Sequence, residues 1–280
     1  MKAKPTEIAG RIKHMVSNTK KRKDGIRSAG KFFAWFSAVL CIMPLFLVFA
    51  VATTGVWQQG PWAGGFTVTW LVQGWKTISP YAWFSIKLSF IILLMNYAIG
   101  IPTSWVLARY RFPGRNLLMS LTNIPIAVPG IAMGLALIIT YPLLRKNGFL
   151  LMSGHLLYTL PYFIGSLAPQ LSDPGVRDVE SVAATLGANF YKRVIHVIYP
   201  KVKTSLLAAT IMVLTLSMGE FNVSFFLFTP KSKTLPVELY SAYITGRIEV
   251  AAAITLCFLF FVVPAAIILE RLGGAKVGQV

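Results

Sequence analysis

The sequence predicts an all-α, polytopic membrane protein with six transmembrane helices. Three observations support this fold class: the composition, the length of the apolar segments and the placement of the basic residues. Hydrophobic residues make up 55% of the 280-residue chain, charged residues only 13%, and the mean hydropathy is +0.65. Soluble domains carry about 25% charged residues and about 45 to 50% apolar ones, so a soluble enzyme and a secreted disulfide scaffold are both excluded.

Six segments are long and apolar enough to cross a bilayer. A spanning helix needs about 20 mostly apolar residues, because the hydrocarbon core is about 30 Å thick and each helical residue rises about 1.5 Å. The expected spans are residues 32–54, 81–108, 117–141, 149–171, 204–228 and 250–269. Four of them contain no charged residue, whereas the second contains Lys87 and the fifth contains Glu220.

The basic residues follow the expected membrane topology. A formal net charge of +18 would indicate a nucleic-acid partner in a soluble protein, but here the tail of residues 1–31 alone carries ten of the 27 basic residues. Such a tail stays in the cytoplasm. With six spans in the domain of residues 32–270, the C-terminal tail of residues 271–280 is cytoplasmic too, and 20 basic residues lie inside against 6 outside. The distribution of basic residues therefore predicts the orientation of the chain in the membrane. It removes the reason to expect a nucleic-acid partner.

The loop between the fourth and fifth spans, residues 172–203, is the longest between spans and the richest in charge. Pro174 and Gly175 interrupt the chain, after which apolar residues recur at helical spacing until Gly187. These residues are Val176, Val179, Val182, Ala183 and Leu186. A second amphipathic segment follows and ends at Pro200. The pattern predicts a short helix, a glycine turn and a second short helix pressed against the membrane.

One string in this loop consists of Glu180, Ser181, Val182, Ala183, Ala184, Thr185, Leu186 and Gly187, followed after twelve residues by Pro200. It resembles the EAA loop of binding-protein-dependent ABC importer permeases. The family pattern is Glu-Ala-Ala, three residues, Gly, nine residues, Ile, one residue, Leu and Pro. The chain departs from this pattern at three positions. Ser181 holds the strict Glu position, with Glu180 one residue earlier. Val182 replaces the first Ala, and Tyr199 replaces the Leu.

The resemblance implies a coupling helix that docks on an ATPase subunit. The residues that would couple to the ATPase are Glu180, Ser181, Ala183, Ala184, Gly187 and Pro200. The implied partners are two ABC ATPase subunits, a second permease subunit, expected to be a different chain, an external solute-binding protein and the lipid bilayer. The implied location is the bacterial inner membrane, with both termini cytoplasmic. A structural alternative is an ordinary solvated loop with one helical turn.

Two further strings extend the resemblance. Residues 123–134, with Pro125, Pro129 and Gly130, look like the third common span of these permeases. The string from Met218 to Asn222, with residues 234–237 soon after, resembles the subgroup that handles polyamines, 2-aminoethylphosphonate and ferric iron. It looks closest to the aminoethylphosphonate members. The expected solute is therefore 2-aminoethylphosphonate or a polyamine, ahead of ferric iron or an oxyanion.

Polar groups at membrane depth are candidates for the translocation path, because a charged side chain at a helix centre costs about 2.5 to 3.5 kcal/mol on insertion scales. Glu220 is expected roughly 24 Å along the fifth span, in its external half. The tentative path residues are Glu220, Asn222, Ser217, Lys87 and Asn96. Lys87 could instead reach the interface with its ammonium group. Asn96 and His155 could line the path, but bonds to neighbouring helices are favoured for both.

No catalytic motif is present in the sequence. It contains no Gly-x-x-x-x-Gly-Lys-Ser/Thr phosphate loop, so any ATP must be bound and hydrolysed by partner subunits. Cys41 and Cys257 lie inside apolar segments and indicate neither a disulfide nor a metal site. The chain is expected to be a non-catalytic transport subunit without a cofactor of its own. The alternatives are a self-contained secondary transporter or channel, and a membrane-embedded enzyme.

Overall fold

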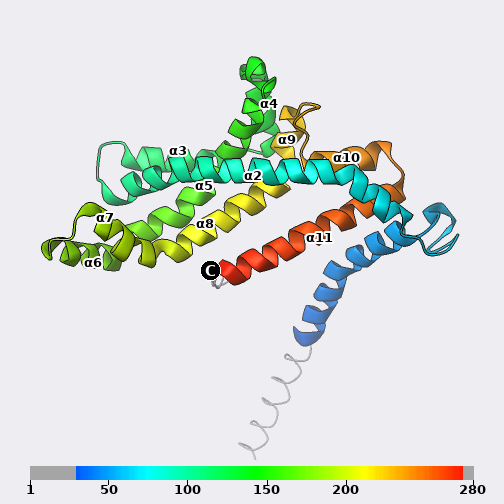
Figure 1. The fold of residues 1–280 in the computed structure, drawn as a ribbon, viewed down its shortest axis with the longest axis horizontal. Coiled ribbons are helices and arrows are strands. Elements are labelled where there is room, and N and C mark those ends of the chain that lie inside the picture. Colours follow the sequence, from blue (N-terminus) through cyan, green and yellow to red (C-terminus); the bar gives the residue numbers. More distant parts are fainter. Residues whose placement is uncertain (1–29, 274–280) are drawn as a thin grey trace, which may run out of the picture.

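The computed structural model describes residues 30–273, which are almost entirely helical (Figure 1). A first helix covers Gly30–Thr53. It is followed by α2 (Thr69–Arg109), α3 (Arg115–Ala127), α4 (Gly130–Thr140), α5 (Phe149–Ser172), α6 (Pro174–Thr185), α7 (Phe190–Arg193), α8 (Tyr199–Gly219), α9 (Asn222–Leu227), α10 (Leu235–Thr245) and α11 (Ile248–Gly273). Short 3₁₀ helices cover Trp57–Gln59 and Pro142–Arg145. Within residues 30–273 the only β pairing is an isolated bridge between Thr54 and Phe66.

The helices confirm an all-α membrane protein. Gly30–Thr53, Thr69–Arg109 and Phe190–Gly219 are each long and apolar enough to cross a membrane, and the bent pair α3 and α4 adds a fourth if it is counted as one span. Helix α5 matches the expected fourth span at its start and within one residue at its end. The basic tail lies almost wholly outside the described residues, and so does most of the C-terminal tail.

The expected third span, residues 117–141, is not one helix. It is divided into α3 and α4, whose axes differ by 103°. Val128 is extended, with φ −86° and ψ 125°, because the ring of Pro129 disfavours helical conformation in the residue before it. Pro129 also lacks the N–H that a continuous helix would use. The prolines of this segment thus bend it sharply, and the single range 117–141 becomes two helices.

The expected fifth span, residues 204–228, begins earlier and ends earlier than predicted. A continuous helix of 30 residues runs from Phe190 to Gly219, and Glu220 is then extended, with φ −71° and ψ 117°. The predicted helix end at Pro200 was wrong, because a widened π-helical turn over Val194–Ile198 precedes the proline. Such a turn relieves the clash between the proline ring and a carbonyl one turn back. The second helix of the loop is thus continuous with the long helix that ends at Gly219.

Helix α2 is longer than the expected second span. It has 41 residues and begins at Thr69, before the predicted start at residue 81. At about 1.5 Å per residue it is roughly 60 Å long, about twice the thickness of the hydrocarbon core. Lys87 therefore lies near the middle of α2. Figure 1 shows α2 running along most of the length of the molecule.

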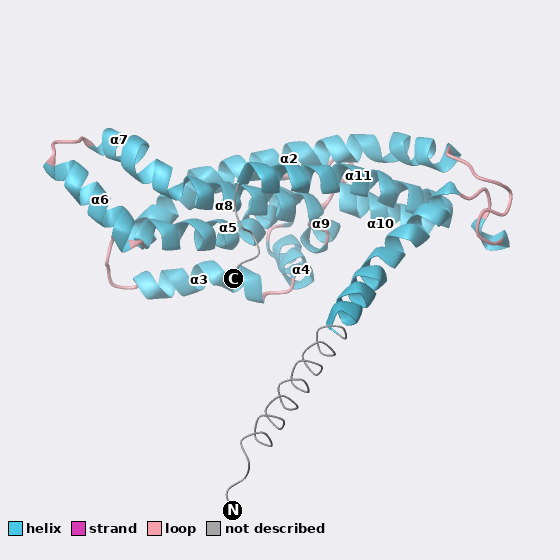
Figure 2. Cartoon of the chain, turned by 90° about the horizontal axis from the view of Figure 1, so that it is seen from below, coloured by secondary structure: helices cyan, strands magenta, loops and turns pink. Residues whose placement is uncertain are grey.

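The core lies where α2, α5 and α8 pack side by side with α9 (Figure 2). Its fully buried members include Ile92, Phe163, Val213, Val223 and Leu227. Helix α11 packs on α2 and α10 in a second cluster. The helix Gly30–Thr53 joins this assembly only near its end, and the α6–α7 hairpin lies at the opposite end of the molecule.

Two glycines allow close contact between helices in the core. At Gly100 of α2, an added Cβ would lie 2.5 Å from the Phe163 ring. At Gly154 of α5, it would lie 2.7 Å from Val223 Cγ1 and 2.8 Å from Leu227 Cδ1. Small residues at helix contacts are the usual way in which membrane helices pack tightly. The short α9 is therefore seated against α5 through Gly154.

Gly154→Ala should destabilise the protein by about 1 to 3 kcal/mol, because the new methyl overlaps two buried side chains. Gly165→Ala is the matched control in the same helix, since its Cβ would meet no atom within 4 Å. That control should be neutral or stabilising by about 0.5 to 1 kcal/mol. Thermal melting of both variants in detergent measures the difference. Equal melting temperatures would contradict the packing of α9 on α5.

Candidate functional site

The predicted loop forms a helical hairpin with a glycine turn. The carboxylate of Asp173 caps α6 by accepting a bond from the Val176 N–H at 3.2 Å. Gly187 has φ +83°, a left-handed conformation that L side chains rarely adopt. Asn189 then caps α7, accepting from the Lys192 N–H at 2.9 Å. The predicted first helix and glycine turn are confirmed.

Glu180 fixes this hairpin to the end of α2. Its Oε2 lies 2.6 Å from Arg109 Nη1, and its Oε1 lies 3.8 Å from Arg193 Nε. The side chains of Arg109 and Glu180 are only 12% and 15% exposed. Arg177 donates a further bond to the Ala108 carbonyl. The carboxylate of Glu180 therefore joins α6 to the end of α2 and to α7.

The apolar face predicted for α6 points mainly outward. Val176 is buried in the core, whereas Val179, Val182 and Leu186 are exposed, Leu186 by 83%. Tyr191 on α7 is 75% exposed. We refer to Val179, Val182, Leu186 and Tyr191 as the hairpin tip. Among the other predicted coupling residues, Ser181 and Pro200 are exposed and Ala183 and Ala184 are half-buried.

A second polar group lies at the break between α8 and α9. The buried carboxylate of Glu220 accepts three bonds: from the Val223 N–H to Oε1 at 2.8 Å, and from the Ser224 N–H and hydroxyl to Oε2 at 2.8 and 2.9 Å. These N–H groups belong to the first turn of α9, which has no earlier carbonyls to bond. Glu220 therefore caps a helix inside the protein.

A chain of hydrogen bonds runs from Glu220 across the core. His155 on α5 lies 2.8 Å from the Ser224 hydroxyl through Nε2 and 3.0 Å from the Ser217 hydroxyl through Nδ1. Ser89 on α2 donates to Ser217 at 3.2 Å. We call Ser89, Ser217, His155, Ser224 and Glu220 the polar chain. It joins α2, α5, α8 and α9.

The polar chain has one consistent direction. The Ser224 hydroxyl donates to Glu220, so it can accept the proton of His155 Nε2. Nδ1 is then the acceptor of the neutral imidazole, and the Ser217 hydroxyl donates to it while accepting from Ser89. The Ser217 and Ser224 hydroxyls each have one donor role and one acceptor role, and the Ser89 hydroxyl begins the chain as a donor. This arrangement needs a neutral His155 with its proton on Nε2.

Asn96 lies beside the polar chain. Its Nδ2 donates to the Ile92 carbonyl and to the Thr159 hydroxyl, both at 2.9 Å. Thr159 in turn donates to the His155 carbonyl. Asn96 is fully buried, and its Oδ1 has no partner among the described residues. The favoured prediction for Asn96 and His155, bonds between neighbouring helices, is confirmed.

The structure brings only some of the predicted path residues together. Ser217 and Glu220 are joined through His155 and Ser224, whereas Lys87 and Asn222 are exposed. Over residues 30–273 no ion pair links Lys87 to Glu220. Ser89 and Ser224 were not among the predicted path residues. Ser224 could have been predicted, because it lies four residues after Glu220 at the start of a helix.

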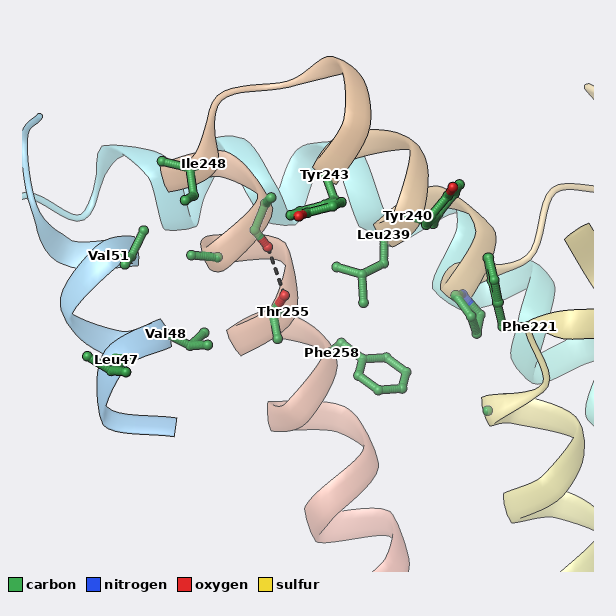
Figure 3. A pocket seen from close by; sticks show the side chains of 14 residues that line it. Leu47, Val48, Val51, Phe221, Leu239, Tyr240, Tyr243, Ile248, Thr255 and Phe258 are labelled. Atoms are coloured by element: carbon green, nitrogen blue, oxygen red, sulfur yellow. Dashed lines mark hydrogen bonds between the residues drawn. The ribbon is translucent and has the colours of Figure 1, made fainter. Parts of the chain in front are cut away.

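An apolar cavity of about 630 Å³ lies beyond the helix break (Figure 3). Figure 3 shows Leu47, Val48 and Val51 of the first helix on one side and residues of α10 and α11 on the other. The hydroxyl of Thr255 already bonds the Ala251 carbonyl at 2.9 Å. The volume is sufficient for a small ligand. Its lining is mostly apolar, so it offers few polar groups to hold a small charged solute. Such a lining suits hydrocarbon.

Comparison with known proteins identifies the family. The family described as binding-protein-dependent transport system inner membrane component matches residues 100–275, more than half of the chain. A protein of Salmonella typhimurium, named as the 2-aminoethylphosphonate transport system permease protein PhnV, is 25% identical over 263 residues, which are 91% of this chain and 97% of that protein.

Two sulfate transport system permease proteins are also similar. CysW of Synechococcus elongatus is 29% identical over 166 residues, covering 53% of this chain and 58% of that protein. CysT of Escherichia coli is 30% identical over 156 residues, covering 50% and 55%. The helical hairpin and the apolar helices of the structure are consistent with this family and with these relatives. The chain therefore belongs to the family of binding-protein-dependent transport system inner membrane components, the permease subunits of ABC importers.

Proposed function

We propose that this permease subunit lines one side of a solute path and is driven by an ATPase subunit that docks on the hairpin tip. The observation that carries the proposal is an exposed apolar tip on a hairpin that is itself held rigidly. Glu180 and Arg109 fix α6 to the end of α2 at 2.6 Å. Exposed apolar groups on a fixed helical element suit a groove on a soluble partner.

The coupling can reach the membrane through a single helix. The second arm of the hairpin continues without interruption from Phe190 to Gly219 and ends beside Glu220. A helix of 30 residues is roughly 45 Å long. A displacement of the hairpin tip would therefore move the far end of α8. There the polar chain transfers the movement to α2, α5 and α9.

The solute that fits best is a small phosphonate or a related oxyanion. The relative that covers almost the whole chain is named for 2-aminoethylphosphonate, and the two shorter matches are named for sulfate. A polyamine would need free carboxylates along its path. The Glu220 carboxylate is already bound by three donors, so it presents little attraction to a cation.

We further propose the complete assembly and its orientation. The family implies ATPase, permease and solute-binding partners. We expect two ATPase subunits, a different permease chain and an external binding protein in the bacterial inner membrane. Six crossings would be formed by the first helix, α2, the bent pair α3 and α4, α5, the Phe190–Gly219 helix and α11. Both termini would then be cytoplasmic, on the side that carries most of the basic residues.

Leu186→Asp should reduce copurification of the ATPase subunit at least about tenfold and abolish ATP-driven uptake, because docking would bury an unpaired carboxylate. Leu143→Asp is the matched control, since Leu143 is 89% exposed in the 3₁₀ helix Pro142–Arg145, far from the hairpin. Copurification followed by uptake in vesicles measures both variants. If the Leu186 variant retained its ATPase, the hairpin tip would not be the docking surface.

Glu220→Gln should lower stability by about 1 to 3 kcal/mol and reduce uptake, because an amide cannot accept all three bonds that the carboxylate accepts. Asn222→Ala is the control for the same break, since the Asn222 side chain is exposed, and its melting temperature should be unchanged. Thermal melting and uptake at matched protein levels measure both effects. An unchanged melting temperature for the Gln variant would show that capping by Glu220 contributes nothing.

Reporter fusions test the orientation. Fusions after Lys31, Arg111 and Lys276 should report the cytoplasm, and fusions near Gly65, Lys146 and Lys233 should report the exterior. The most informative is Lys146, because it follows the bent pair α3 and α4. A cytoplasmic signal there would mean that this pair is a re-entrant loop and does not cross the membrane.

A further inference from the structure

The turn between α2 and α3 contains a basic cavity. Helix α2 ends at Arg109 and α3 begins at Arg115, and the chain turns at Gly114, which has φ +84°. The cavity has a volume of about 440 Å³. It is lined by Arg111, Phe112, Gly114, Arg115, Asn116 and Leu117. It therefore combines two guanidinium groups with apolar side chains at the end of a membrane helix.

An apolar groove lies next to this cavity, between α2 and α3. It has a volume of about 320 Å³, and its lining includes Val106, Leu107, Phe112 and Leu118. Phe112 lines both spaces, so the two are adjacent. The groove follows the two helices away from the arginines. The combined surface is amphipathic, with a basic end at the turn and an apolar extension.

The charge at this turn is not neutralised within the described part of the chain. Arg111 is exposed and has no hydrogen bond or ion pair there. Arg115 donates from Nε to the Leu107 carbonyl at 2.7 Å and from Nη1 to Asn116 Oδ1 at 3.4 Å, which orients its guanidinium group. No Asp or Glu occurs between residues 25 and 172. The nearby Glu180 is already paired with Arg109.

We propose that this turn binds an anionic phospholipid. Its phosphate would be held by Arg111 and Arg115, and one acyl chain would lie in the groove over Phe112. Arginine binds phosphate through several donors, and basic pockets beside membrane helices are suited to anionic headgroups. An inorganic phosphate would leave the groove empty. The site is thus assigned to a lipid and is independent of the transported solute.

Arg111→Gln tests the charge. The full-length protein, delipidated in detergent, is titrated with phosphatidylglycerol or phosphatidylcholine, and native mass spectrometry gives the dissociation constants. Phosphatidylglycerol should bind more tightly, and Arg111→Gln should weaken its binding about fivefold, the contribution of one basic residue near a membrane surface. Lys201→Gln removes an exposed charge elsewhere and should leave the constant unchanged. Equal weakening by both variants would overturn the proposal.

Val106→Trp tests the groove without changing any charge. Val106 is 41% exposed, and the larger ring would fill the space assigned to the acyl chain, so phosphatidylglycerol should again bind more weakly. Glycerol 3-phosphate, which has no acyl chain, should not displace the lipid at equal concentration. Displacement at equal concentration would show a phosphate site instead. If Arg111→Gln left lipid binding unchanged but lost the copurified ATPase, the turn would be a protein interface. Displacement by glycerol 3-phosphate or this loss of the ATPase would each overturn the proposal.

Discussion

Backbone N–H and C=O groups inside a bilayer must be bonded by the protein itself, because lipid offers no hydrogen bonds. This constraint bears most heavily on the two helix breaks, at Pro129 and at Glu220. The breaks lie against each other, since a Cβ added to Gly130 would stand 3.7 Å from Glu220 Oε1. Glu220 satisfies the start of α9 with its carboxylate. The break before α9 is thus capped by a side chain of the protein itself, close to the break at Pro129.

The polar chain connects the break at Glu220 to the neighbouring helices. Because Ser217 is on α8, His155 on α5 and Ser89 on α2, the donors and acceptors at the break are shared by helices distant in sequence. Movement of any one of these helices would leave buried groups unpaired, at about 1 to 3 kcal/mol for each. The end of α8 can therefore move only together with its neighbours. That property is required if a motion of the hairpin is to reach the path.

The parts of this fold that could be predicted from the sequence are those set by local chemistry. The bounds of α5 follow from an apolar run between Gly148 and Asp173, and the turn at Gly187 follows from its residue type. The break at Pro129 was also available locally, because the residue before a proline avoids helical conformation. The ion pair of Glu180 with a residue 71 positions away was not, since only tertiary packing brings the two together. The polar chain escaped prediction for the same reason.

The distribution of charge explains why the basic residues remain at the surface. Most acidic side chains of the described residues are used within the chain: Asp173 and Glu220 as helix caps, and Glu180, Glu238 and Glu249 in pairs with Arg109, Lys233 and Arg247. Few carboxylates therefore remain to neutralise the other cations. The excess positive charge must face water, headgroups or partner subunits. The same imbalance leaves the arginines at the turn between α2 and α3 without a carboxylate partner, where anionic headgroups can approach.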